Sequence, residues 1–327
     1  WTPPIPEEPW FPVAQKLRFA LDYVRYLAPR YADVEKLRLR NIDRTPRVVR
    51  WLTSGPGAWL VGPRRVQAAL TRLERLLPES AAMTALLEAE RPDVVLLTSL
   101  TFSRSLAMDQ LKAARRLGVP TAACILSWDH LSSKAIIRDL PDRLFVWNNV
   151  QREEATTMHG VPGDRVVVTG AQCFDRWFDR RPRRDRSAFA ARVGLPDDRP
   201  FVLWVCSALF LGSPPEAAFV LEWARSVRAS SDPVLRDAAI LIRPHPSRAA
   251  EWEGVDWSTL PNVALWGGNP IDDESRADYF DSLHHSAAVV GLNTSAFIEA
   301  GIVGRPVLAI LPNEFASSQD GTLHFRY

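Results

Sequence analysis

The sequence contains only three cysteines in 327 residues, Cys124, Cys173 and Cys206. They lie far apart, and no two have the spacing of metal ligands. Cys124 and Cys206 fall within apolar runs, so we expect them to be small buried apolar side chains. This usage indicates a reducing compartment, and we expect a cytoplasmic protein.

Long apolar runs and net charge are also lacking. No stretch of 18 uncharged apolar residues occurs, so the sequence predicts no membrane-spanning helix. The 40 basic and 38 acidic residues exclude binding of nucleic acid by bulk electrostatics alone. The chain begins at Trp1 rather than methionine, and its last segment, GTLHFRY, has no turn or capping signal, so we expect a fragment at both ends.

The common nucleotide and metal fingerprints are absent as well. There is no G-x-x-x-x-G-K-[ST] and no G-x-G-x-x-G after a strand, which argues against a P-loop protein, a kinase or a plain dehydrogenase. There is no C-x-x-C or H-E-x-x-H, so we expect no protein-bound catalytic zinc and no other metal.

What the sequence does contain is an alternation of short apolar runs with helical patterns. Uninterrupted apolar runs are typical of parallel strands that are buried on both faces. A basic, proline-interrupted run at residues 180–186 divides the pattern, and we interpret it as a solvated linker. We therefore predict an α/β protein with two Rossmann-like parallel-sheet domains facing across a cleft, residues 1–180 and 181–327. The apolar runs span residues 93–98, 120–126, 143–147, 165–169, 201–206, 239–243, 263–266, 287–291 and 306–311, and the helical patterns span residues 81–90, 105–117, 150–159, 216–228 and 294–300.

An amphipathic helix precedes the first sheet, at residues 14–40, with a break near Pro29. Its second face carries several arginines and lysines. Two interpretations stay open: a solvated helix face, or a surface that rests on anionic lipid at the inner face of the membrane.

The segment Arg243-Pro244-His245-Pro246 follows a buried strand directly. Both Arg243 and His245 precede proline, which favours an extended backbone and a stiff exit from the sheet. An arginine there could pair with phosphate by two hydrogen bonds, and a histidine could donate another. The alternative is a rigid turn that leads into a helix.

A second polar segment, Asn293-Thr294-Ser295, ends a buried strand at Gly291 and opens a helix. The unpaired N–H groups of a helix start attract anions, and the two hydroxyls could add donors to a diphosphate. Glu299, one turn later, could accept hydrogen bonds from a ribose. The alternative is a plain capped helix.

Two more polar segments follow strands. Residues 127–134, SWDHLSSK, contain Asp129 and His130, either of which could act as a general base facing the cleft. The alternative is a polar loop whose tryptophan packs on the sheet. Residues 319–325 could reach the same cleft.

These motifs resemble a known superfamily. The order of RPHP and then GLNTSAFIEAGIVGRPVL, at residues 243–246 and 291–308, resembles the C-terminal half of GT-B glycosyltransferases. The likeness is greatest to the bacterial surface-polymer group, which includes CDP-glycerol glycerophosphotransferases and capsule-type transferases, and the UDP-GlcNAc 2-epimerases look like more distant relatives. The segments SWDHLSSK, VWNNVQREEA and VTGAQCFDRWF are similar to that group too, so the resemblance covers about residues 90–327.

The resemblance implies a nucleotide-activated donor as substrate, no bound cofactor, and an acceptor on the first domain. By position, Arg243 and His245 match the phosphate-facing motif, and the donor-site helix start is matched by Asn293, Thr294, Ser295 and Glu299. Ser207 matches a loop that approaches the donor.

Our leading hypothesis is a metal-independent glycosyl or glycerophosphoryl transferase of capsule or surface-polymer synthesis. Asp129 is the first choice as the base that activates an acceptor hydroxyl, and His130 is the second. His245, with Arg243, would stabilise the leaving diphosphate. Two alternatives stay open: a sugar-nucleotide 2-epimerase, and a non-catalytic module that binds a glycan or another partner.

Overall fold

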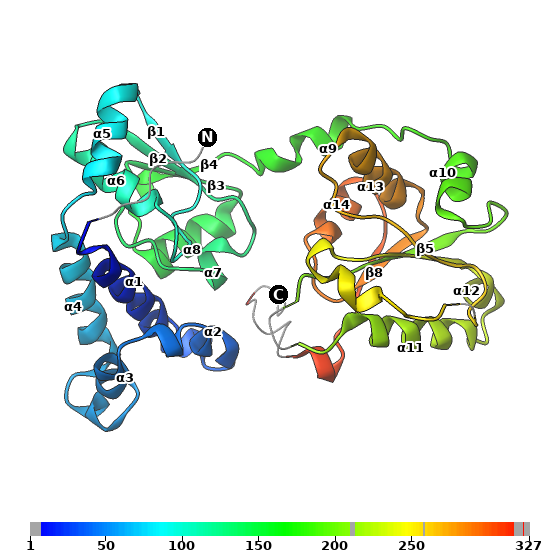
Figure 1. The fold of residues 1–327 in the computed structure, drawn as a ribbon, viewed down its shortest axis with the longest axis horizontal. Coiled ribbons are helices and arrows are strands. Elements are labelled where there is room, and N and C mark those ends of the chain that lie inside the picture. The colour runs from blue at the N-terminus through cyan, green and yellow to red at the C-terminus, as the bar shows by residue number, and fades with distance from the viewer. Residues whose placement is uncertain (1–7, 210–212, 258, 317–322, 324–327) are drawn as a thin grey trace. The chain divides into compact units, whose positions relative to one another are not determined.

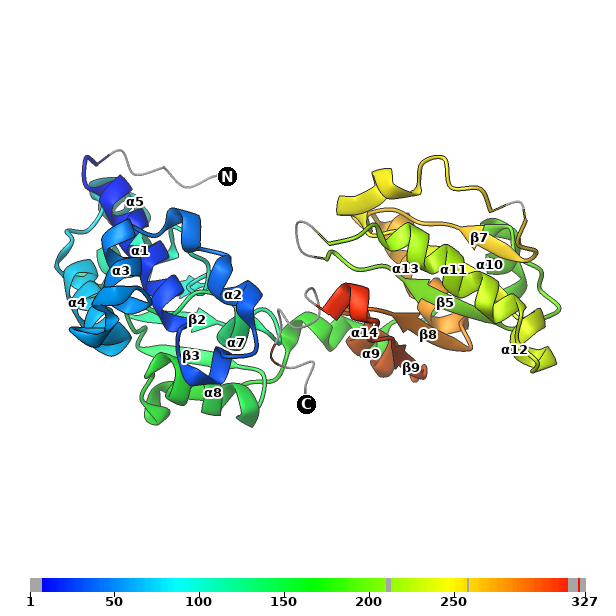
Figure 2. The same cartoon turned by 90° about the horizontal axis from the view of Figure 1, so that it is seen from below.

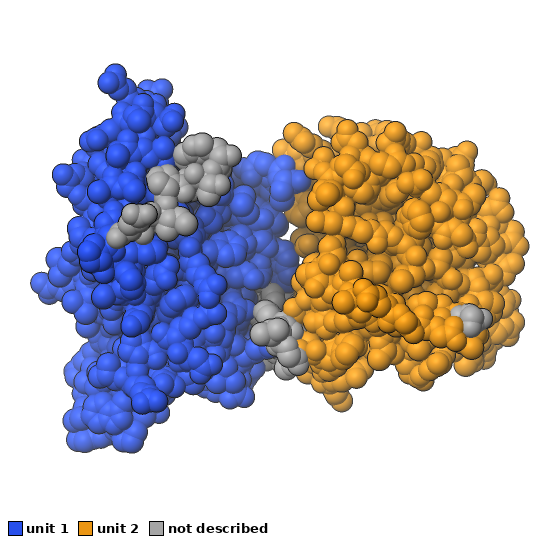
Figure 3. All heavy atoms as spheres, in the orientation of Figure 1, with its two compact units in different colours: residues 1–173, 320–327 blue, residues 174–319 orange. Residues whose placement is uncertain are grey.

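The computed structural model describes residues 8–209, 213–257, 259–316 and 323. The chain forms two compact units (Figures 1 and 3): unit 1 comprises residues 1–173 and 320–327, and unit 2 comprises residues 174–319. Each unit is built on one parallel sheet, which confirms the predicted α/β class. Among the described residues, no helix is long and apolar enough to cross a membrane.

The sheet of unit 1 has four strands in the order β1-β2-β3-β4. All its pairings are parallel, and the strands match the predicted apolar runs. Their bounds are Val95–Leu97 for β1, Thr121–Cys124 for β2, Arg143–Val146 for β3 and Val166–Val168 for β4.

Only one face of this sheet is buried, so the expectation that both faces are covered is wrong here. Leu97 and Leu144 lie on the buried face, in one core with residues of the helices that connect the strands. On the other face Leu96 is 57% exposed, and Val167 is also exposed. The strands follow one another in sequence order, and right-handed crossovers then place every connecting helix on the same face.

Helices dominate the part of unit 1 before the sheet. The predicted break near Pro29 is confirmed, since α1 ends at Arg25 and a short 3₁₀ turn follows. Leu323 is buried against Tyr26 and Leu37 of this region. The helices are α1 (Phe11–Arg25), η1 (Pro29–Tyr31), α2 (Glu35–Leu39), η2 (Ile42–Arg44), α3 (Arg47–Thr53), η3 (Pro56–Trp59), α4 (Gly62–Leu76), α5 (Ala81–Glu90), α6 (Ala107–Arg116), α7 (His130–Ser133), α8 (Asn149–His159) and η4 (Gly163–Arg165).

Helix α1 is buried within unit 1 rather than laid on its surface. Arg18 makes two hydrogen bonds to Asp109 of α6, at 3.0 and 2.8 Å, and one to Glu74 of α4, at 3.2 Å. Arg25 donates to the backbone oxygens of Leu131 and Lys134. Both arginines are buried, so neither contributes to an exposed basic face, and the lipid-facing interpretation of residues 14–40 stays a prediction.

The sheet of unit 2 has five parallel strands in the order β7-β6-β5-β8-β9. In order of appearance this is 3-2-1-4-5, the order of a Rossmann fold (Figure 2). The direction of winding reverses between β5 and β8, and in open sheets of this kind ligands bind beyond the strand ends at that point. The strands are β5 (Phe201–Val205), β6 (Ala239–Arg243), β7 (Val263–Leu265), β8 (Ala288–Gly291) and β9 (Val307–Ala309).

The basic run at residues 180–186 belongs to unit 2 and is not a solvated linker. The Arg184 guanidinium lies 2.9 Å from Asp278 of α13, and the Arg183 amide donates to Asp281 on the same helix at 2.9 Å. These contacts fix the run against the acidic side of α13. The remaining helices are η5 (Gln172–Phe174), α9 (Asp175–Asp179), α10 (Arg186–Val193), α11 (Glu216–Arg228), α12 (Pro233–Asp237), η6 (Pro246–Trp252), α13 (Asp273–His285), α14 (Ala296–Ile302) and η7 (Asn313–Phe315).

The three cysteines differ in environment. Cys206 is buried, as predicted, and burial raises the pKa of its thiol well above the ordinary value. Cys124 is only partly buried because it lies on the open side of the unit 1 sheet, in register with Phe145. Cys173, the last residue of the continuous part of unit 1, is exposed.

Candidate functional site

A pocket of about 630 Å³ opens at the carboxyl end of the unit 2 sheet. Residues from the ends of β5 and β6 contribute to its wall, together with the start of α14. The pocket therefore lies beside the reversal point between β5 and β8, where the strand order predicts a ligand. Its lining residues from the predicted motifs are Arg243, His245, Thr294, Ser295 and Glu299.

Arg243 is the last residue of β6 and is only 5% exposed. Its Nη1 is buried and has no hydrogen-bond partner among the described residues, and its Nη2 makes a single long contact, 3.4 Å, with the backbone oxygen of Gly268. Burial lowers the pKa of the guanidinium, but arginine keeps its charge at neutral pH. A buried cation without a carboxylate partner is costly unless an anion comes to it.

The position of the Arg243 side chain is fixed by its neighbours. Gly267 has a φ of +104°, and a Cβ atom there would lie 2.5 Å from the guanidinium. On another side the guanidinium carbon lies 5.0 Å from the centre of the Tyr279 ring. Only glycine at position 267 leaves room for the guanidinium, so the backbone forms a cradle for it.

His245 lies two residues further on, at the start of η6. Its Nδ1 accepts a hydrogen bond from the Ser247 amide at 3.2 Å and lies 2.8 Å from the Ser247 hydroxyl. Burial, and then the nearby Arg248, lower the pKa of the imidazole. The ring is therefore neutral at pH 7 with its proton on Nε2, which makes His245 a hydrogen-bond donor in the pocket wall.

Ser207 and Asn293 connect the two strands that flank the reversal point. The Asn293 amide donates to the Ser207 hydroxyl at 3.0 Å. Ser207 is in turn held by Glu216, the first residue of α11, whose carboxylate accepts from the Ser207 amide at 2.8 Å and from the Trp204 indole at 3.0 Å. Burial raises the pKa of Glu216 to about 7. Ser207 and Asn293 thus lie behind the pocket and hold its loops, and neither is among its lining residues.

The start of α14 differs in detail from the expectation. The helix begins at Ala296, and Ser295 makes no capping hydrogen bond with its side chain. The Thr294 hydroxyl accepts from the Ala296 amide at 3.3 Å instead. The Ser295 hydroxyl therefore remains available in the pocket wall.

Glu299, one turn further along α14, also lines this pocket. It accepts a hydrogen bond from the Tyr279 hydroxyl. Burial raises the pKa of the Glu299 carboxyl, although that hydrogen bond works against the rise. A carboxylate with one occupied oxygen can still accept from a sugar hydroxyl, which is the role that the sequence suggested.

Asp129 and His130 lie in unit 1 and not in this pocket: Asp129 ends the loop that follows β2, and His130 is the first residue of α7. Burial disfavours the charged form of Asp129, but Lys134 at 3.3 Å and the Ser127 hydroxyl at 2.7 Å outweigh that effect and lower its pKa. Burial lowers the pKa of His130, whose Nδ1 has no hydrogen-bond partner among the described residues. The role of either residue as a base stays a prediction. Of residues 319–325, all but Leu323 lie outside the described residues.

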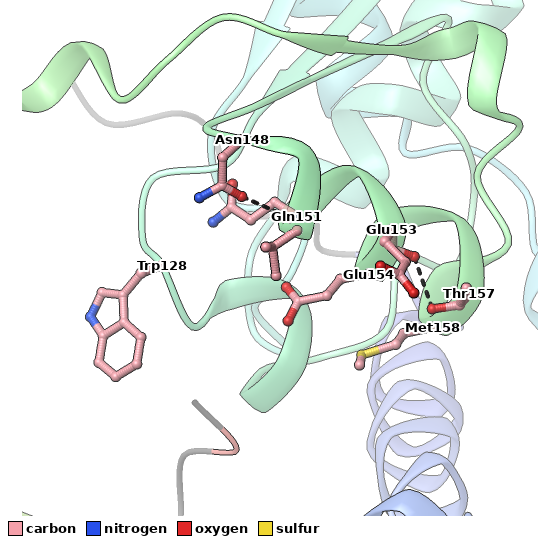
Figure 4. A pocket seen from close by; sticks show the side chains of 8 residues that line it. Trp128, Asn148, Gln151, Glu153, Glu154, Thr157 and Met158 are labelled. Atoms are coloured by element: carbon pink, nitrogen blue, oxygen red, sulfur yellow. Dashed lines mark hydrogen bonds between the residues drawn. The ribbon is translucent and has the colours of Figure 1, made fainter. Parts of the chain in front are cut away.

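Unit 1 has its own pocket, of about 610 Å³, close to this loop. Figure 4 shows Trp128 on one side of it and the side chains of α8 on the other, with Asn148 at the start of that helix. The Asn148 carboxamide oxygen accepts from the Gln151 amide at 2.9 Å, which caps α8. The α8 side carries both apolar residues, Val150 and Met158, and polar ones, among them Glu153 and Glu154.

Comparisons with known proteins agree with this architecture. No family model and no curated protein matches the sequence. Among solved structures, UDP-GlcNAc 2-epimerase from Neisseria meningitidis, bound to UDP-GlcNAc, superposes with a TM-score of 0.51 at 17% identity over 73% of this chain and 65% of the epimerase. S. aureus MnaA, in a structure with UDP, has a TM-score of 0.51 at 14% identity over 92% of this chain and 77% of MnaA.

The fold is GT-B. The two parallel sheets, one of them with Rossmann strand order, and these similar structures confirm the predicted fold class. The chain spans 65% of the length of the Neisseria epimerase. The narrower likeness to surface-polymer transferases stays a prediction.

In unit 2, three features in and around the pocket were not predicted from the sequence. Tyr279 comes from a helix that the apolar pattern did not reveal, and Gly267 and Glu216 carry no motif. The Gly267-Gly268 pair after β7 was the one available signal, because paired glycines after a strand indicate a close approach of backbone to another group.

Proposed function

We propose that the protein is an enzyme that acts on a nucleotide-activated donor. In this proposal it transfers a sugar or glycerol phosphate to a surface glycan or polymer. The proposal rests mainly on Arg243. Its buried guanidinium, whose Nη1 has no partner among the described residues, lines a pocket at the reversal point of a Rossmann-like sheet. A pyrophosphate supplies the negative charge and the oxygen acceptors that this arrangement lacks.

Each pocket residue then has a definite role. Arg243 and the Nε2–H of His245 would donate to the diphosphate, and the Ser295 hydroxyl would add a third donor. When a sugar is transferred, the bond between the sugar and the diphosphate breaks and charge grows on the leaving nucleoside diphosphate. When glycerol phosphate is transferred, the pyrophosphate bond breaks and charge grows on the leaving nucleoside monophosphate. These contacts strengthen in either transition state, each by on the order of 3 kcal/mol. Glu299 would hold the ribose or the sugar.

The acceptor side of the reaction would fall to unit 1. The pocket beside Trp128 would receive the acceptor, and Asp129 would take the proton from its hydroxyl. The ion pair with Lys134 keeps Asp129 ionised at neutral pH, which a base requires, but it also weakens the carboxylate as a proton acceptor. His130 is therefore a serious second choice, because its neutral imidazole can accept a proton at pH 7.

A thermal-shift screen of UDP-, CDP-, GDP- and CMP-linked compounds tests the donor site. A compound that binds only the native protein raises the melting temperature, and the rise should disappear in Arg243→Ala. Turnover of the matching donor should fall at least tenfold in the same variant. Arg225→Ala, at an exposed position on α11, is the matched control and should behave as the native protein does. An unchanged shift and turnover in Arg243→Ala would remove the assignment.

A sugar-nucleotide 2-epimerase is the second candidate, and the similar structures favour it. The two structures named above, each with a TM-score of 0.51, were solved with UDP-GlcNAc or with UDP. It would use the same donor pocket without an acceptor. Incubation with UDP-GlcNAc alone separates the two candidates: conversion of the sugar without added acceptor shows an epimerase, and conversion only with acceptor shows a transferase.

A further inference from the structure

The helices α3 and α4 and the η3 turn between them form a lobe at one end of unit 1, which we call the helical lobe (residues 47–76). In Figure 1, α3 and η3 form the lower end of the unit, beneath α4 and α1. Its inner side is an ordinary core, since Val49, Val66 and Leu70 pack against α1. The outer side has a different composition, and the further inference concerns that side.

Large apolar side chains are exposed on the outer side of the lobe. Trp59, in the η3 turn, is 82% exposed, and Leu76, at the end of α4, is 72% exposed. An isolated exposed apolar residue needs no explanation, but several on one small lobe indicate a contact surface. The exposed apolar residues of the lobe are Val48, Trp51, Trp59, Leu60, Leu73 and Leu76.

The same lobe has a strong excess of positive charge. Residues 47–76 contain six arginines and one acidic residue, Glu74. Glu74 is fully buried in its ion pairs with Arg18 and Lys112, so it does not offset the charge at the surface. The exposed arginines of the lobe are Arg47, Arg64, Arg65, Arg72 and Arg75.

The geometry presents both kinds of residue together. On α4 the residues at positions 65, 69, 72 and 76 recur at helical spacing and all are exposed, whereas Val66 and Leu70 face inward. Fifteen residues of helix make this face about 20 Å long. At the near end of α4, the Trp51 ring packs so closely on Gly57 that a Cβ there would lie 2.6 Å from it, which holds the turn that carries Trp59.

We propose that the outer side of the helical lobe binds the surface of an anionic phospholipid bilayer. Tryptophan and leucine insert at the boundary between headgroups and acyl chains, and arginines pair with lipid phosphates around them. Charge complementarity selects an anionic membrane, since each arginine near such a surface adds attraction that depends on salt. The inference goes beyond the proposed reaction, because none of these residues lines either pocket described above.

Sedimentation of the full chain with vesicles tests this proposal. We expect binding to vesicles of phosphatidylcholine with about one third phosphatidylglycerol, weak binding to phosphatidylcholine alone, and weaker binding as salt rises. The variants Trp59→Ser with Leu60→Ser, and Arg64→Gln with Arg65→Gln, should each reduce binding by about tenfold or more. Because all four side chains are exposed, both variants should keep the native melting temperature.

Matched controls replace the same residue types elsewhere on the surface. Val234→Ser with Leu235→Ser, and Arg225→Gln with Arg236→Gln, change exposed residues of unit 2 and should leave vesicle binding unchanged. Equal loss of binding in the controls, or no loss in the lobe variants, would overturn the proposal. Two other results would also overturn the proposal. One is a native dimer that the variant Trp59→Ser with Leu60→Ser converts to monomer, and the other is binding to nucleic acid that requires the arginines when no vesicles bind.

Discussion

At the scale of single residues, Arg243 is the most informative side chain of the molecule. Most buried charges in this protein are paired: Arg18 has two carboxylates and Arg138 has Asp22 at 2.6 Å. Arg243 instead faces a tyrosine ring and one distant carbonyl oxygen. Since an unpaired buried cation lowers stability, its place at the wall of a pocket is best explained by an anionic ligand.

This contrast leads to a prediction about the unliganded protein. Arg243→Met removes a buried charge that has no carboxylate partner, so the free energy of unfolding should stay the same or rise by about 1–2 kcal/mol. Urea unfolding measures it. Arg138→Met, which removes one partner of a buried pair, is the control and should lower the free energy of unfolding. A fall of similar size in Arg243→Met would mean that the arginine is structural.

A second prediction at the scale of single residues concerns Glu216 and the pH dependence of the free energy of unfolding. Burial raises its pKa from 4.5 in the unfolded chain to about 7, so the folded protein holds the proton more tightly. The tighter binding of this proton adds on the order of 3 kcal/mol to the free energy of unfolding below about pH 4.5. This contribution is lost as the pH rises through about 7. Relative to the native protein, Glu216→Gln should therefore gain stability between pH 5 and 8.

Denaturant unfolding across that range checks the Glu216 prediction. Glu222→Gln, an exposed substitution on the same helix, is the matched control and should follow the native pH dependence. If the difference between Glu216→Gln and the native protein were constant from pH 5 to 8, the carboxyl would not titrate in this window.

At the scale of helices and strands, the buried network around Arg18 joins three helices that are distant in sequence. It connects α1 to Glu74 of α4 and to Asp109 of α6, and Lys112 lies 3.2 Å from Glu74. All of these side chains are buried or nearly so, which makes the network costly to break. It is therefore what aligns the helical lobe with the sheet of unit 1.

Breaking this network should have a large effect. Arg18→Met leaves two carboxylates in the interior and should lower the free energy of unfolding by about 3–5 kcal/mol. Adding Glu74→Gln and Asp109→Asn should recover much of that loss, since no carboxylate of the network then stays buried and charged. Arg38→Met, which breaks an exposed pair with Glu35, is the control and should cost less than about 1 kcal/mol. Urea midpoints give the comparison.

The strands were predictable from the sequence, and several helices were not. The nine strands found among the described residues all lie within the predicted apolar runs, because parallel strands need uninterrupted apolar residues. Helix α13 was missed because its buried side includes Asp278, Asp281 and Ser282, which mask an apolar pattern. Those aspartates are buried only because Arg184 and Arg192 reach them, and a pairing of that kind between distant segments has no local signature.

The burial of the two faces of each sheet was predicted less well, because it too depends on contacts between segments that are distant in the sequence. An apolar run indicates that a strand can be buried, but it does not indicate whether helices cover one face of the sheet or both. The number of covered faces depends on the edge of the sheet to which each new strand is added, and the sequence does not specify that edge. The exposure of Leu96 and Val167 follows from the strand order of unit 1 alone.

At the scale of the whole molecule, the candidate site was predictable in part. The motifs at Arg243 and Thr294 were recognised because they follow buried strands and combine residues that bind phosphate. That β5 and β8 are neighbours could not be read from the chain. The 82 residues between Val205 and Ala288 include two further strands and several helices, and their path is set by tertiary packing.

The unequal exposure of the three thiols has a practical consequence. Cys206 is shielded and Cys124 is partly covered, whereas Cys173 is open to reagents and stands where unit 1 gives way to unit 2 along the chain. With Cys124 replaced by serine, a maleimide dye would attach at that junction without an engineered cysteine. Its emission would then register any rearrangement between the units when a donor is added.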